Sequence, residues 1–121
     1  MARSPLTPEM IGRVAERLRA LADERRIALL LRLQMGEANV GTLAADCGLG
    51  QASASKHLAS LKQVGLVESR RDGTQTIYRV ADESVFDLCA IVCDGVRRHA
   101  RLQHEAVLGP APASGRRRRI A

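Results

Sequence analysis

Hydrogen-bonding and basic side chains are concentrated between Gly48 and Val67, where the sequence reads GLGQASASKHLASLKQVGLV. Ala54, Leu58 and Leu61 recur there at intervals of four and three residues, the spacing of one buried stripe on a helix. Polar residues between these positions are expected to face outward and to offer donors and acceptors suited to base edges and phosphates. The candidates for such contacts are Gln51, Ser53, Ser55, Lys56 and His57.

A second candidate site is the pair Cys89 and Cys93, whose four-residue spacing puts both sulfurs on one face of a helix. Such a pair can bind a thiophilic metal or arsenite, with Cys47 or His99 as a third donor, or it can react as a thiol or redox sensor. The same residues can also be packing residues, because free cysteine behaves as a small buried hydrophobe. These interpretations stay open for the pair, so no cofactor is specified. For Cys47 we favour packing.

Capping signals predict three helices that must hold the polar segment in place. Thr7 precedes an amphipathic helix over Pro8–Leu21, in which proline is tolerated in the first turn. Asp23 is the predicted cap of a second, largely apolar helix that ends near Gly36, and Asn39 is the predicted cap of a short third helix.

Glycines occur at both ends of the polar segment. Gly48 and Gly50 lie where a tight turn between two short helices needs residues that tolerate a positive φ. Gly65 is placed to end the fourth helix. The third and fourth helices therefore read as a helix-turn-helix.

A β-hairpin is predicted after the fourth helix. Residues 66–71 and 75–80 alternate between apolar and polar, and residues 71–74 supply turn chemistry. Arg70 and Arg71 are expected near its tip, where they can reach phosphates or a minor groove. The alternative is that both are solvated turn arginines.

The last predicted helix, capped by Asp82 or Ser84, carries a broad apolar face. Residues at helical spacing along this face, together with those that widen it, are Val85, Phe86, Leu88, Cys89, Val92, Cys93 and Val96. Such a face on a terminal helix predicts a dimer interface.

These parts, in this order, carry a resemblance. The run NVGTLAADCGLGQASASKHLASLKQVGLVESRRDGTQTIYRV resembles the core of the arsenic-repressor (ArsR/SmtB) family of winged helix-turn-helix transcription regulators, over roughly Ala15 to His99. The resemblance implies a mainly α fold of about five helices with a two-stranded wing, in the order α-α-α-α-β-β-α. It further implies a homodimeric repressor on a double-stranded DNA operator, with the first helix contributing to the dimer interface.

The metal motifs of that family do not transfer cleanly to this chain. The thiolate pair that similar arsenic and cadmium sensors carry falls on residues 39–42, which contain no cysteine. Asp87 and Cys89 loosely fit the first half of the zinc pattern, but Ala100 and Gln103 stand where histidines are expected. A zinc sensor of that type is therefore not indicated.

Composition limits the remaining possibilities. The net charge is +6, but four of these charges come from the run Arg116 to Arg119, which leaves a net charge of +2 for the rest of the chain. Tyr78 and Phe86 are the only aromatic residues, so stacking platforms for single strands are not expected. Without a long apolar run or a hydrophobic leader, the protein is expected to be cytoplasmic with no membrane partner. Three cysteines do not form a disulfide framework.

The predicted organisation is a flexible arm over residues 1–7, one dimerising and DNA-binding domain over 8–106, and a disordered basic tail over 107–121. No catalytic constellation is present, so an enzyme is not expected. A repressor released by a thiol-reactive, redox or metal signal is the leading interpretation. Its alternatives are an effector-independent repressor and a winged-helix protein-interaction module, whose docking face would expose apolar residues.

Overall fold

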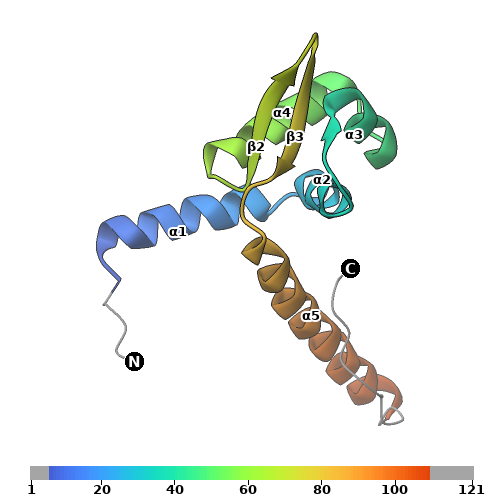
Figure 1. The fold of residues 1–121 in the computed structure, drawn as a ribbon. Helices are drawn as coiled ribbons and strands as arrows, with labels where there is room; N and C mark the ends of the chain where they lie inside the picture. Colours follow the sequence, from blue (N-terminus) through green and yellow to red (C-terminus); the bar gives the residue numbers. More distant parts are fainter. Residues whose placement is uncertain (1–5, 110–121) are drawn as a thin grey trace. The chain divides into compact units, whose positions relative to one another are not determined.

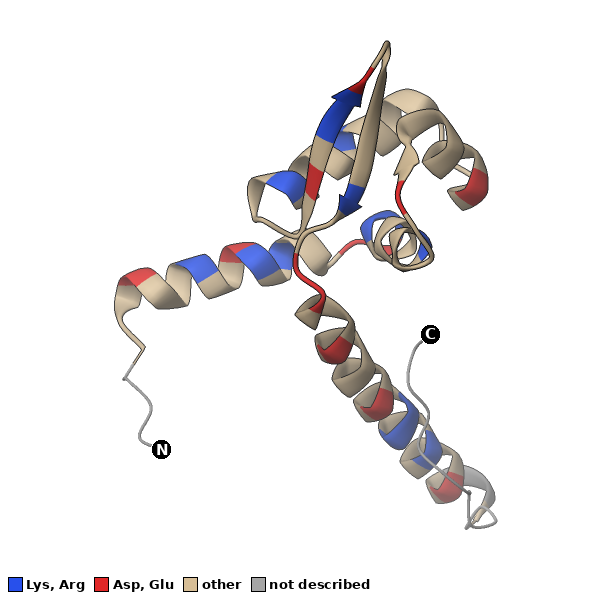
Figure 2. Cartoon of the chain, in the orientation of Figure 1, with Lys and Arg blue, Asp and Glu red and all other residues tan. Residues whose placement is uncertain are grey.

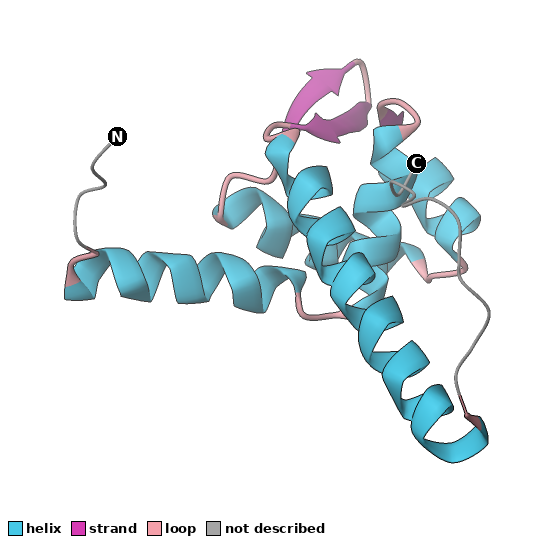
Figure 3. Ribbon diagram, turned by 90° about the horizontal axis from the view of Figure 1, so that it is seen from below, coloured by secondary structure: helices cyan, strands magenta, loops and turns pink. Residues whose placement is uncertain are grey.

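The computed structural model describes residues 6–109, so most of the predicted N-terminal arm and the Arg116 to Arg119 run lie outside the described residues. Helices dominate, with a small sheet between them in sequence (Figures 1 and 3). The elements are α1 (Pro8–Leu21), α2 (Glu24–Gln34), β1 (Ala38–Asn39), α3 (Val40–Cys47), α4 (Gln51–Gln63), β2 (Val67–Asp72), β3 (Gln75–Val80) and α5 (Ser84–Leu108). The chain divides into two compact units, one up to Asp82 and one from Glu83 onward.

The first three helices begin at the predicted caps. The side-chain oxygen of Thr7 accepts a hydrogen bond from the Met10 backbone N–H at 3.1 Å. Asp23 Oδ1 accepts from the Arg25 backbone N–H at 2.8 Å. At the start of α3, Asn39 Oδ1 accepts from the Thr42 backbone N–H, also at 2.8 Å. Each cap satisfies a backbone donor that the helix itself leaves unpaired, so these starts are determined locally.

The core of the first unit is built from aliphatic side chains. The predicted stripe of α4, Ala54, Leu58 and Leu61, is fully buried, each residue being 0% exposed. Leu29 of α2 and Leu43 of α3 are equally buried. Burying a leucine side chain stabilises a fold by about 1.5–3 kcal/mol, so this shared core holds α4 to α2 and α3.

Gly48 and Gly65 follow the ends of their helices with a positive φ, as expected, whereas Gly50 does not have a positive φ. Gly48 follows α3 with φ 68°, and Gly65 follows α4 with φ 79°. At the end of α4, the Leu66 N–H donates to the Leu61 carbonyl at 3.0 Å, the hydrogen bond typical of a glycine-terminated helix. Gly50 has φ −68°, an ordinary value, so the prediction that it supplies a positive φ is wrong.

The sheet has three strands in the order β1-β3-β2, one more than the two-stranded wing predicted. In β1, Ala38 pairs with Tyr78 and Asn39 pairs with Ile77, antiparallel to β3. A strand of two residues is too short to show the alternation by which strands are recognised in a sequence. β1 therefore anchors the wing to the start of α3.

The second unit contains α5, which begins at Ser84 after Glu83. The cap position of α5 is occupied by Glu83 and not by Asp82 or Ser84 as predicted, and the Glu83 side chain makes no capping hydrogen bond. Val85 and Phe86 are buried, whereas Val92 and Val96 are exposed at 56% and 62%. Phe86 thus does not widen an exposed face as predicted. No helix within residues 6–109 is long and apolar enough to cross a membrane.

Candidate nucleic-acid interface

The outer face of α4 is polar, small and basic. Gln51, Ser55 and Lys56 are exposed as predicted, and Ser53 is half-buried on the flank. Sequence reasoning missed four other exposed residues of the helix: Ala52, Ala59, Lys62 and Gln63. Ala52, Ala59 and Gln63 lie opposite the buried stripe and Lys62 lies on its flank, so the helical period contained the signal for them. With short side chains at its centre, this face can approach a nucleic-acid groove closely.

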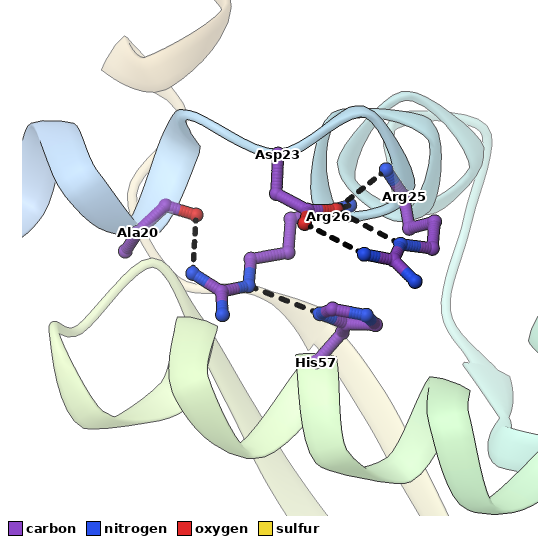
Figure 4. A network of polar contacts seen from close by, with 5 residues as sticks. All are labelled: Ala20, Asp23, Arg25, Arg26 and His57. Carbon is purple, nitrogen blue, oxygen red and sulfur yellow. Dashed lines mark hydrogen bonds and ion pairs between the residues drawn. The ribbon is translucent and has the colours of Figure 1, made fainter.

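His57 was predicted to face outward, and this prediction is wrong. Its side chain is 9% exposed, and its Nδ1 accepts a hydrogen bond from Nε of Arg26 in α2 at 3.1 Å (Figure 4). Position 57 lies three residues after Ala54 and directly before Leu58, which puts it at the border of the buried stripe. The imidazole therefore joins the helix to the core.

Arg26 of α2 contacts two other helices, α4 through His57 and α1 through Ala20. Besides His57, its guanidinium donates from Nη1 to the Ala20 carbonyl at the end of α1, at 3.4 Å (Figure 4). Its backbone N–H donates to Asp23 Oδ1. The side chain of Arg25 donates to the same carboxylate and lowers the pKa of Asp23 to about 2. The loop between α1 and α2 is therefore tied to the inner side of α4.

A second arginine holds the other end of α4. Arg17 of α1 donates from Nη2 to the Val64 carbonyl at 2.7 Å and forms an ion pair from Nη1 with Asp82 at 2.6 Å. The Val64 carbonyl lies just past the last turn of α4, where helix carbonyls need partners. α1 therefore fixes both the end of α4 and the segment that follows β3.

The two wing arginines differ in their surroundings. Arg70 lies within β2 and makes a two-pronged ion pair with Glu37, with N–O distances of 2.6 and 2.8 Å. This contact holds the pKa of Glu37 below its ordinary value. Arg71, by contrast, donates a long hydrogen bond, 3.5 Å, to Thr76 Oγ1. The hairpin turns at Gly73, with φ 65°, so Arg70 lies back from the tip and is engaged within the chain.

A polar groove separates the start of α4 from the wing tip. It has a volume of about 300 Å³, and its lining residues are Asn39, Val40, Gly41, Gln51, Thr74, Gln75 and Thr76. The Asn39 amide donates to Gln75 Oε1 at 3.2 Å, which links the cap of α3 to the tip. The groove thus brings the predicted contact residue Gln51 beside the wing.

The three cysteines are free and half-buried. Burial raises the pKa of the Cys89 thiol above its ordinary value, and burial together with nearby Asp46 does the same for Cys47. Among residues 6–109, no group of three or more histidine, cysteine or acidic side chains is arranged to hold a metal ion. Sensing of a thiophilic ion by Cys89 and Cys93, with or without Cys47 or His99 as a further donor, stays a prediction.

Comparisons with known proteins agree with this architecture. The family described as "Bacterial regulatory protein, arsR family" matches residues 23–69, from the cap of α2 into β2. The HTH-type transcriptional regulator Rv0324 of Mycobacterium tuberculosis is 42% identical over 83 residues, which make up 69% of this chain and 37% of that protein. The HTH-type transcriptional repressor SmtB of the same species is 37% identical over 93 residues, or 77% of this chain and 67% of that protein.

A solved structure matches at the level of the fold. It is the solution structure of the homodimeric winged helix-turn-helix DNA-binding domain (fragment 1–100) of Mb0332 from Mycobacterium bovis, a possible ArsR-family transcriptional regulator. The two are 38% identical with a TM-score of 0.70, over 84% of this chain and 94% of that one. The predicted winged helix-turn-helix fold is confirmed, and the chain belongs to the ArsR/SmtB family of bacterial transcription regulators.

Proposed function

We propose that this protein is a homodimeric, sequence-specific repressor that binds double-stranded DNA through α4 and the wing. The observation that carries the proposal is the outer face of α4, which is exposed and contains no acidic residue. The opposite side of the same helix is the buried stripe that anchors it in the core. A helix of this kind fits the major groove. The relatives named as regulators and a repressor support the same role.

Dimerisation is supported by exposed apolar residues on two helices, each considered separately. On α1 they are Met10, Ile11, Val14 and Leu18, between 43% and 54% exposed. On α5 they are Ile91, Val92, Val96 and Leu102, between 56% and 65% exposed. Single exposed apolar residues are ordinary, but rows of them on a helix mark an interaction surface. A second copy of the chain suits a self-complementary contact of this kind.

Within this proposal, the residues that read base edges are Gln51, Ser53 and Ser55. Lys56 contacts a phosphate, and Arg71 is the DNA contact of the wing. His57 and Arg70 leave the set of contact residues and take positioning roles, because one is buried against Arg26 and the other is paired with Glu37. In a dimer, the two copies of α4 would enter successive major grooves roughly 34 Å apart on a palindromic site.

Selection of bound duplexes from a random library, followed by gel-shift titration, tests the proposal. We expect Gln51→Ala to weaken binding to the selected duplex by about 1–2 kcal/mol and to relax sequence preference at its base. Lys56→Ala should weaken all duplexes alike and flatten the salt dependence. If the wild-type protein enriches no sequence, the proposed function is refuted.

A protein-interaction module and an enzyme are the rival classes. A docking face on α4 would expose large apolar side chains. The exposed residues of α4 are instead polar, basic or small: Gln51, Ala52, Ser55, Lys56, Ala59, Lys62 and Gln63. This face favours DNA binding over protein docking, and we propose the cytoplasm, where an operator would lie, as the site of action. Retention of a partner protein together with failure to bind any duplex would favour the interaction module.

The signal that releases the repressor is a separate question, centred on Cys89 and Cys93. If the signal is thiol-reactive, redox or metal, treatment with an oxidant or a thiophilic metal should change operator affinity in the wild type. The same treatment should leave operator affinity unchanged in a Cys89→Ser, Cys93→Ser double variant. An effector-independent repressor would show no response in either protein. Free-thiol counts beside each titration distinguish a true lack of response from incomplete oxidation.

Cys89 itself is expected to react slowly. Its raised pKa lowers the thiolate fraction near neutral pH, and thiolate is the reactive form. In a Cys47→Ser, Cys93→Ser variant, alkylation by iodoacetamide at pH 7.5 should therefore be several-fold slower in the folded protein than in the same protein in denaturant. An equal or faster rate in the folded state would show an activated thiol instead of a packing residue.

A further inference from the structure

The wing has two chemically different faces, set by the register of β2 and β3. Val67 pairs with Val80, Ser69 with Tyr78 and Arg71 with Thr76, and alternate residues of a strand share a face. Val67 is buried, and Ser69 Oγ accepts a hydrogen bond from Lys62 Nζ of α4 at 2.8 Å. Arg71 therefore lies on the face turned toward α4, and Arg70 lies on the opposite one.

The face away from α4 has its charges compensated internally. Arg70 pairs with Glu37, and Arg79 pairs with Glu68. Asp72 shares this face by strand alternation and adds a further negative charge. With three carboxylates against two guanidinium groups, this face has no net attraction for a polyanion.

The surfaces that face each other across the wing and α4 carry only positive charge. The sequence of α4 contains Lys56 and Lys62 and no acidic residue, and Figure 2 shows α4 with blue segments and no red one. On the wing side, the positions that alternate with Arg71 are valine, serine, threonine and tyrosine. Lysines and arginines without carboxylates are the electrostatic signature of a phosphate contact.

Lys62 completes a line along α4. At about 100° per residue, Lys62 lies within roughly 20° of Ser55 and of Gln51 around the helix axis. Gln51 lines the groove at the wing tip, and Lys62 bonds Ser69 nearer the base of the wing. Eleven residues of helix span roughly 16 Å, about the length of the five strand residues from Ser69 to the tip.

We propose that one phosphodiester strand of the operator lies along this line between α4 and the wing, with Lys62 and Arg71 as its two cationic contacts. The inference rests on the proposed function and adds Lys62 to it. Ser69 is a positioning residue: it takes one of the three ammonium donors of Lys62 and leaves two for phosphate oxygens.

The test uses the full chain and two probes, a duplex selected by the wild type and a random-sequence duplex of equal length. Each neutralised phosphate adds about 0.9 to the slope of log affinity against log salt. Lys62→Gln and Arg71→Gln, present in both subunits, should each reduce the slope by about 1.8 per dimer. Each should weaken both probes equally, by about fivefold per lost contact at 0.15 M salt.

Arg79→Gln is the matched control, because it removes the same charge from the opposite face of the wing. It should leave the slope unchanged. Ser69→Ala keeps the charge of Lys62 and should lower affinity about twofold without changing the slope by a full contact. Circular dichroism melting of each variant checks that the fold is kept.

Three outcomes would overturn the inference while leaving the proposed function intact. One is an unchanged slope in Lys62→Gln and Arg71→Gln. Another is a loss confined to the selected duplex, which would indicate base reading instead of a backbone contact. The third is an equal loss in Arg79→Gln, which would indicate a diffuse charge effect. Absence of duplex binding by the wild type would instead refute the proposed function itself.

Discussion

Val92→Glu is expected to convert the proposed homodimer into a monomer and to weaken binding to the selected duplex by at least about 100-fold. Val92 is 56% exposed on α5, and Val96 lies one turn further along the same stripe. A carboxylate buried at this contact would lose its hydration without gaining a partner. A monomer also loses the gain in effective concentration that comes from binding two half-sites at once.

The matched control for this prediction is Arg101→Gln. It changes the net charge by the same amount, and nine residues of helix place it about 180° from Val92. Sedimentation velocity should show a dimer for the control and a monomer for Val92→Glu, with similar circular dichroism. A Val92→Glu dimer of wild-type stability would move the interface away from this face of α5. Ile11→Glu provides the same test for α1.

Removing the guanidinium of Arg26 is expected to lower the free energy of unfolding by about 1–3 kcal/mol. In Arg26→Met, the buried Nδ1 of His57 loses its donor, and the hydrogen bond from Arg26 Nη1 to the Ala20 carbonyl is lost as well. The buried acceptor then keeps its desolvation cost without compensation. Denaturant titration measures this loss of free energy directly. Thermal melting should show it as a fall in melting temperature of roughly 3–6 °C per kcal/mol.

A double-mutant cycle with His57→Leu separates positioning from DNA contact. Replacing both partners by apolar groups of similar size removes the unsatisfied acceptor, so the double variant should be more stable than the sum of the single changes predicts. If His57 only positions α4, the double variant should keep the sequence preference of the wild type. A loss of preference at one base would return His57 to the set of contact residues.

Signals in the sequence itself determined the helices and the face of α4 that is buried. Thr7, Asp23 and Asn39 cap their own helices because a short side chain reaches backbone donors two or three residues away. Ala54 and Leu61 are buried because the helical period alone brings apolar residues onto one stripe. Both effects act within one or two turns of chain, so no tertiary contact is needed to infer them.

Contacts between distant segments were decided by the tertiary structure. His57 is polar and its position borders the buried stripe, so its direction depended on whether another element offered a donor, and Arg26 of α2 does. Arg70 pairs with Glu37, 33 residues earlier, because β1 and β3 bring that loop beside the wing. Lys62 meets Ser69 for the same kind of reason. Periodicity gives the angle of a side chain around its own element, but which group lies opposite depends on how the elements pack.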